Sequence, residues 1–221
     1  MPILFQDRRD AGRQLGSLIA PQVTAEAVFL GIPRGGVPIA DELSRHCQRP
    51  VGLMAVRKLP IPDNPEMGFG AVGPSGVVAL NTAVMAWAGI SEAAAAAVRT
   101  AVLEEIRRRL AVYDHQPANL AGRSAWLVDD GLATGYTMLA AIRECHALHA
   151  ASVQVAAPVC HAEARARVQQ EAPVYCLHTD YGYSFAVASF YARFPDLEDN
   201  EVVQALATAR AEARALPDMA P

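Results

Sequence analysis

The chain has 221 residues, of which 52% are hydrophobic and 19% are charged, a composition that predicts a compact globular protein with a sizeable core. A formal net charge of −4 and an isoelectric point of about 5.9 argue against non-specific binding to nucleic acid or to an anionic membrane. At this length we expect one domain over residues 1–221, with hood or flap segments at residues 1–25 and 179–221.

The amino terminus and the cysteines together predict a cytoplasmic protein. Residues 7–10, Asp-Arg-Arg-Asp, stand where a signal peptide would carry its apolar region, and no run approaches the roughly 18 apolar residues of a membrane span. The cysteines form no Cys-x-x-Cys pair and no zinc spacing with histidines, so we expect reduced thiols and no protein metal site. They are Cys47, Cys145, Cys160 and Cys176.

The first predicted element is a short amphipathic helix. Ala11, Leu15 and Ile19 have helical spacing, and Pro21 ends the pattern. Arg8 lies at the start of this helix, with Arg9 and Arg13 close by. Two interpretations stay open: these arginines lie in solvent, or the segment folds over a ligand with an arginine facing a phosphate.

The second element is a strand followed by a glycine turn and a helix. Residues 27–32 are apolar without alternation, as in a parallel strand that is buried on both faces, and residues 37–47 have helical spacing. Between them, Gly35 and Gly36 leave backbone N–H groups accessible, and Arg34 offers a guanidinium fork to an anion. The turn therefore predicts an anion-binding loop, although a glycine turn alone is weak support.

A further strand, residues 52–56, ends directly in two cations, Arg57 and Lys58. Two cations at a carboxyl end suggest a second grip on a diphosphate, and the alternative is that they are strand-end charges in solvent. Residues 59–76 are rich in proline and glycine, which predicts a long loop that acts as a lid over the site. Glu66 and Asp63 are the obvious acids in this loop.

The most informative run is residues 125–137, Ala-Trp-Leu-Val-Asp-Asp-Gly-Leu-Ala-Thr-Gly-Tyr-Thr. Four apolar residues predict a buried strand, and a helical pattern begins at Tyr136. A turn that opens a helix is a ready anion site, because its N–H groups have no intrahelical partner. Asp129 and Asp130 would repel that anion unless they meet hydroxyl groups or a divalent cation. The run therefore predicts a binding site for a phosphorylated sugar. The alternative interpretation is an ordinary strand–turn–helix without a ligand.

The remaining pattern completes a doubly wound α/β fold with a mostly parallel sheet. Ser91 caps a predicted helix to about residue 113, and strands at residues 152–159 and 174–177 flank a helix at residues 162–171. Ligands of such folds bind at the carboxyl ends of the strands, where all three candidate loops fall. An aromatic cluster in residues 179–195 predicts packing of a flap, with Tyr183 or Phe185 stacking on a base as the alternative. A surface helix is predicted at residues 200–216.

Residues 125–137 closely resemble the phosphoribosyl pyrophosphate (PRPP) signature of the type I phosphoribosyltransferases, and the Pro-Arg-Gly-Gly and Arg-Lys segments are also similar to elements of that family. The resemblance implies displacement of pyrophosphate from PRPP by a nitrogen nucleophile, with a nucleobase as the expected acceptor and magnesium carried mainly by the substrate. Asp129 and Asp130 would hold the ribose hydroxyls. The pyrophosphate would be bound by Arg34, Gly35, Gly36, Arg57 and Lys58, with Asp129, Asp130, Arg34 and Lys58 as the catalytic set. The 5′-phosphate would lie on Gly131, Leu132, Ala133, Thr134, Gly135, Tyr136 and Thr137.

One departure from the family pattern concerns Ala133. The hypoxanthine–guanine enzymes carry an aspartate there, so alanine resembles the adenine and uracil enzymes and removes that acid from the mechanism. No residue stands out as a general base, and Glu66 is the candidate. A homodimer is a family-level expectation.

Two other functions compete with this interpretation. A PRPP-sensing regulator without catalysis keeps the same binding residues, and the acidic isoelectric point argues against nucleic acid as its partner but not against protein. A dinucleotide-dependent dehydrogenase fails, because no Gly-x-Gly-x-x-Gly follows the first strand.

Overall fold

The computed structural model describes residues 3–113 and 119–215. Its central feature is a five-stranded, fully parallel sheet in the order β2-β1-β6-β7-β8. The strands are β1 (Ala27–Gly31), β2 (Val51–Leu53), β6 (Ser124–Val128), β7 (Ser152–His161) and β8 (Val174–Asp180). The doubly wound α/β prediction is therefore confirmed, and β1 and β6 are direct neighbours.

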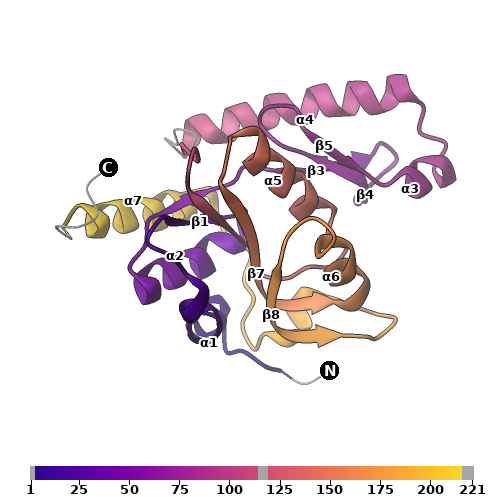
Figure 1. Cartoon of the computed structure of the whole chain (residues 1–221). Helices are drawn as coiled ribbons and strands as arrows, with labels where there is room; N and C mark the ends of the chain where they lie inside the picture. The colour runs from indigo at the N-terminus through magenta and orange to yellow at the C-terminus, as the bar shows by residue number, and fades with distance from the viewer. Residues whose placement is uncertain (1–2, 114–118, 216–221) are drawn as a thin grey trace.

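Helices cover both faces of this sheet (Figure 1). On one face α1 (Arg8–Ile19) and α2 (Gly36–Cys47) pack, and on the other α5 (Tyr136–Ala147) and α6 (Ala162–Val168). Consecutive strand residues serve opposite faces, since Phe29 packs on the α1 and α2 side and Leu30 on the α5 and α6 side. Burial on both sides explains why these strands read as unbroken apolar runs.

A second, smaller sheet corrects the loop predicted for residues 59–76. The chain there forms an antiparallel sheet of β3 (Arg57–Ile61), β4 (Asn64–Val72) and β5 (Val78–Leu80). Pro60 is accommodated because the β3–β4 register shifts on both sides of it. Leu59 and Ile61 alternate as buried residues on β3, and Phe69 is buried on β4, so the apolar residues prevail over the proline and glycine content.

The same sheet also shortens the strand predicted at residues 52–56. Strand β2 ends at Leu53, and Arg57 and Lys58 open β3 instead of closing β2. Two helices accompany the small sheet (Figure 1): α3 (Thr82–Trp87) and the long α4 (Glu92–Val112). Ser91 caps α4 as predicted, accepting a hydrogen bond from Ala94 N at 3.2 Å.

The amino-terminal segment meets the segment that precedes the last helix. The N–H groups of Leu4 and Phe5 donate to Phe190 O at 2.9 and 3.1 Å, and Ala192 N donates to Phe5 O at 2.8 Å. Arg193 extends the contact by pairing with Asp7 at 2.7 Å. We call residues 4–8 and 190–199 together the terminal clasp. The clasp leads into the last helix, α7 (Asp199–Ala215). Of two short 3-10 helices, η1 (Ala20–Gln22) follows α1 and η2 (Val187–Phe190) runs into the clasp.

No helix in the described part of the chain is both long and apolar enough to cross a bilayer. The four cysteines are free thiols.

Candidate functional site

Two loops meet at the carboxyl ends of the neighbouring strands β1 and β6. The contact is so close that a Cβ added to Gly35 would lie 1.9 Å from Asp130 Oδ2, and one added to Gly36 would lie 2.2 Å from Val128 O. Only glycine fits at these two positions, because any side chain would collide with the neighbouring loop. The peptide bond between Pro33 and Arg34 is cis. The structure thus brings together the glycine turn and the acid pair that the sequence analysis placed in one site.

The two carboxylates of the acid pair have different partners. Asp129 Oδ1 accepts a hydrogen bond from Asp130 N at 2.9 Å. Asp130 Oδ2 pairs with Arg8 Nε at 2.9 Å, and both side chains are largely buried. The Tyr191 hydroxyl donates to Asp130 O at 2.7 Å. Asp130 is therefore held by both halves of the terminal clasp.

Burial and mutual repulsion make this acid pair electrostatically unfavourable. Burial raises the pKa of Asp129 well above its usual value, and the charge of Asp130 raises that pKa further. Burial also raises the pKa of Asp130, against the opposing effect of Arg8. Groups in this state gain from a nearby cation or from hydroxyl donors. The site is suited to a ligand that supplies either one.

The turn after the acid pair has the geometry of an anion site. Gly135 precedes α5 with a left-handed backbone, at φ 82° and ψ −11°. Thr134 is exposed, and Thr137 is partly so. Among the described residues, no protein acceptor is recorded for the backbone N–H groups at positions 133–137. Unpaired amides beside a helix N-terminus favour an anion through both hydrogen bonding and the helix dipole.

Not every residue of the predicted phosphate turn faces outward. Leu132 is 2% exposed and belongs to the core, and its backbone bridges to Cys160 on β7. Gly131 lies against Val187, whose side chain would be 2.6 Å from an added Cβ. These two residues shape the turn, whereas the exposed amides follow them. Arg167 of α6 also holds the turn, donating to Thr134 O and lying 5.0 Å from the Tyr136 ring.

The predicted diphosphate side is more occupied than the phosphate turn. Arg34 Nη1 lies 3.7 Å from Asp199 Oδ1 of α7. Arg57 Nη1 lies 3.4 Å from Glu105 Oε1 of α4. Lys58 is exposed, and its Nζ donates to Glu66 O across the β3–β4 hairpin at 2.7 Å. Within the described residues, none of these three cations has a recorded contact with the acid pair.

Arg34 and Arg57 belong to one polar cluster. Tyr113 donates to Asp199 at 2.8 Å, and Glu105 is shared by Arg57, Arg108 and Arg109. The Arg108 guanidinium is the largest influence that lowers the pKa of Glu105, to about 2. Burial, followed by the carboxylate of Asp199, raises the pKa of Tyr113 to about 12. The phenol therefore remains a hydrogen-bond donor.

Of the amino-terminal arginines, Arg9 and Arg13 are largely exposed, as the solvent interpretation predicts, whereas Arg8 fits neither interpretation. Arg8 is buried, but it faces Asp130 and not the phosphate turn. Its guanidinium also donates to Pro195 O at 2.8 Å and lies 3.7 Å from the Phe194 ring centroid. Arg9 pairs with Glu42 at 2.8 Å.

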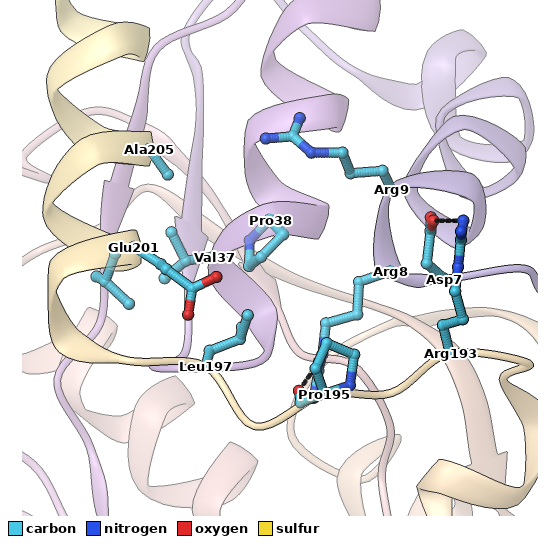
Figure 2. Close-up of a pocket in the computed structure, with 11 residues that line it drawn as sticks. Asp7, Arg8, Arg9, Val37, Pro38, Arg193, Pro195, Leu197, Glu201 and Ala205 are labelled. Carbon is cyan, nitrogen blue, oxygen red and sulfur yellow. Dashed lines mark hydrogen bonds and ion pairs between the residues drawn. The ribbon is translucent and has the colours of Figure 1, made fainter.

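A cavity of about 240 Å³ opens beside Arg8, between α1, α2 and α7. Figure 2 shows Arg9 and Pro38 above it, with the segment from Arg193 to Leu197 running beneath. Arg8 contributes both to this cavity and to the ion pair with Asp130. The cavity is lined by Asp7, Arg8, Arg9, Val37, Pro38, Arg193, Pro195, Leu197, Glu201, Val202 and Ala205.

Most side chains of the aromatic cluster in residues 179–195 pack against other rings. Phe185 contacts the rings of His161 and Phe190, with centroids 5.7 and 5.5 Å apart. Tyr183 is fully exposed.

Glu66, the candidate general base, accepts a hydrogen bond from Lys58 through its backbone carbonyl. Among the described residues, no group of three or more His, Cys, Asp or Glu side chains could hold a metal ion.

Sequence reasoning missed the partners that come from distant segments: Asp199, Glu105, Tyr191 and Arg167. No local pattern marks them, because each is more than 20 residues from the group it contacts. The helical spacing of Asp199, Val202 and Leu206 does indicate a helix with one buried face, and that is the only signal the sequence carries for the α7 contact.

Comparison with known proteins gives a consistent result. A family model described as the phosphoribosyl transferase domain matches residues 19–187. A protein of Mycobacterium tuberculosis strain H37Rv named "Putative phosphoribosyl transferase" is 41% identical over 205 residues, which cover 90% of this chain and 46% of that protein. The chain thus spans about half the length of the curated relatives it matches.

Solved structures show the same similarity. The crystal structure of TT1426 from Thermus thermophilus is 33% identical, with a TM-score of 0.78 over 93% of this chain and 98% of that one. A purine phosphoribosyltransferase from Pyrococcus horikoshii, at 16% identity and a TM-score of 0.50, shares the fold over 90% of this chain and 99% of that one.

Proposed function

The chain belongs to the phosphoribosyl transferase domain family, and from that premise we propose that it transfers the 5-phosphoribosyl group from PRPP to a nitrogen nucleophile, with release of pyrophosphate. The observation that carries the proposal is the contact between the two loops. It sets a partly buried acid pair between a turn of exposed amides and a glycine turn that begins with Arg34.

Each part of PRPP finds a complementary group in this arrangement. The 5′-phosphate would accept hydrogen bonds from the amides at positions 133–137 and from the hydroxyls of Thr134 and Thr137. The ribose hydroxyls would donate to Asp129 and Asp130, which relieves the repulsion between the two carboxylates. The diphosphate would meet Arg34 and the amides of Gly35 and Gly36.

The chemistry would be mainly electrostatic. Breaking the bond between C1 of the ribose and the diphosphate leaves positive charge on the ring and negative charge on the leaving group. Asp129 and Asp130 would favour the positive ring, and Arg34, Arg57 and Lys58 would favour the departing diphosphate. Fixed charges aimed at charge that grows in the transition state accelerate a reaction without reorganising during it.

Magnesium fits the acid pair on chemical grounds. Two partly buried carboxylates whose pKa values are raised by burial, with the charge of Asp130 adding to the rise at Asp129, are suited to a hard divalent cation that arrives with the substrate. Bound there, magnesium would neutralise part of the diphosphate charge. Asp129 is the better placed ligand, because Arg8 already neutralises Asp130.

The acceptor we propose is a nucleobase. Ala133 is exposed at the turn, so no acid from this position reaches the acceptor. Attack by a ring nitrogen that already carries a lone pair suits a site in which no general base has been assigned.

Asp130→Asn tests the proposal, because it removes the charge and keeps one acceptor oxygen. Losing charged hydrogen bonds to ribose should weaken PRPP binding about 10- to 100-fold. Titration calorimetry with magnesium and PRPP measures this, and the circular dichroism spectrum should not change. Asp196→Asn is the matched control, since Asp196 is exposed and the charge change is the same. Unchanged PRPP affinity in Asp130→Asn would count against the site.

A second candidate function is a PRPP sensor without catalysis. The observation in its favour is that Asp130 and Arg34 already have internal partners, Arg8 and Asp199. Measuring pyrophosphate release from PRPP and magnesium over a panel of nucleobases separates the two functions. Tight PRPP binding with no release on any base would favour the sensor.

A further inference from the structure

The contact between Arg34 and α7 plays no part in the transfer reaction proposed above. Helix α7 begins at Asp199, outside the residues that the family model matches. Val202 and Leu206 of α7 are buried in a cluster with Val37 of α2, the residue that follows the glycine turn. This packing fixes the first turn of α7 beside Arg34.

Asp199 is held firmly on one side and loosely on the other. Its Oδ1 accepts a hydrogen bond from the Tyr113 hydroxyl at 2.8 Å. The same oxygen lies 3.7 Å from Arg34 Nη1, which is an ion pair without a hydrogen bond. Both charged side chains are about one-third exposed, at 36% for Arg34 and 33% for Asp199. Exchanging this weak contact for a diphosphate therefore costs little.

The surroundings make an incoming anion favourable at Arg34. Arg57 and Arg109 belong to the same cluster, and the arginines there outnumber the carboxylates Glu105 and Asp199. A diphosphate that reached Arg34 would gain from this excess of positive charge. It would also approach the carboxylate of Asp199, and like charges at such distances repel each other.

We propose that Asp199 is a positioning residue for Arg34 that competes with the diphosphate of the substrate for the same guanidinium. Helix α7 then sets how tightly the diphosphate is held: Asp199 keeps the guanidinium near the site before the substrate arrives, and its charge weakens the hold on the pyrophosphate product. This inference rests on the proposed function, because it assumes that Arg34 binds diphosphate.

The sign of one effect separates this role from a structural one. A residue that only holds α7 in place would, on removal, leave pyrophosphate binding unchanged or weaker. A competing residue would, on removal, make that binding tighter. Asp199→Asn is the informative change, because its amide oxygen can still accept the hydrogen bond from Tyr113.

The experiment titrates magnesium pyrophosphate into the full chain by calorimetry. Asp199→Asn should bind it about two- to fivefold more tightly than the wild type, the range expected for one partly exposed ion pair. The gain should shrink at high salt, where such pairs are screened. Asp199→Glu should bind like the wild type, and so should the control Asp196→Asn, which changes the charge of an exposed residue three positions earlier.

Two further measurements test whether the effect of Asp199 acts through Arg34. In an Arg34→Gln background, Asp199→Asn should have no effect on pyrophosphate affinity. In the wild type, pyrophosphate should speed hydrogen exchange in the first turn of α7, a result that stands even if a variant folds poorly. Equal or weaker binding by Asp199→Asn would overturn the inference alone. If neither the wild type nor any variant binds pyrophosphate or PRPP, the proposed function is overturned, and this inference with it.

Discussion

The proposed phosphate turn, residues 131–137, and the proposed diphosphate side of the site are built in different ways. The turn is one continuous run after β6, and it offers backbone amides whose direction is set by Gly135 and the start of α5. The diphosphate side takes Arg34 from one loop and Arg57 and Lys58 from a separate sheet. Its arginines form ion pairs with carboxylates from α4 and α7. A site made of backbone is local in sequence, whereas a site made of side chains depends on distant partners.

The glycine turn joins these two regions, and changing it should have the largest effect. In Gly36→Ala the new Cβ would meet backbone, Val128 O at 2.2 Å, so the two loops must separate. We expect a loss of about 1–3 kcal/mol of unfolding free energy, measured by urea denaturation. In Gly35→Ala the obstacle is the side chain of Asp130, so PRPP binding should suffer more than stability. Equal stability losses in the two variants would contradict this assignment.

Asp129→Asn separates stability from binding on the acid side. Since burial and Asp130 raise the pKa of Asp129 in the folded state, its ionised form opposes folding at neutral pH. The variant should therefore gain about 0.5–2 kcal/mol of stability at pH 7 while binding PRPP more weakly. The wild type regains this stability as the pH falls through the raised pKa, so the difference should vanish below about pH 4. Thermal melts from about pH 3 to 8 would show it, and a variant less stable at pH 7 would contradict the repulsion.

A smaller effect is expected in the phosphate turn itself. Thr134→Val removes a hydroxyl and leaves the amides in place, so affinity for PRPP should fall about two- to tenfold. Thr100→Val, on the exposed surface of α4, is the control. A loss much greater than tenfold would mean that the side chain, and not the backbone, carries the phosphate contact.

Lys58→Gln should have the smallest effect. The Lys58 amine is exposed and donates a hydrogen bond to Glu66 O. Removing its charge should therefore weaken pyrophosphate binding only about two- to threefold, and the effect should depend on salt. Calorimetry at two salt concentrations measures this. A loss greater than tenfold would instead indicate that the β3–β4 hairpin closes over the site, as the lid prediction for residues 59–76 requires.

The parallel sheet and the two loops at its edge were predictable, because short apolar runs followed by glycine turns have few other structures. The β3–β4 hairpin was not predicted, since Pro60 and the glycines masked the alternation of Leu59 and Ile61 on β3. The ion pairs of Arg8 with Asp130 and of Arg34 with Asp199 were not predictable at all. Each joins residues more than 100 positions apart, and nothing local to either residue encodes its partner.

The terminal clasp bears on how this protein can be dissected. A fragment cut at the limits of the family match, residues 19–187, would lack both Arg8 and Asp199. It would also uncover Val159 and Val37, which Phe190 and Val202 now help to bury. In such a fragment Asp130 would lack its ion pair with Arg8, Arg34 would lack Asp199, and apolar side chains would be newly exposed. Its ligand affinities would therefore not represent those of the full chain.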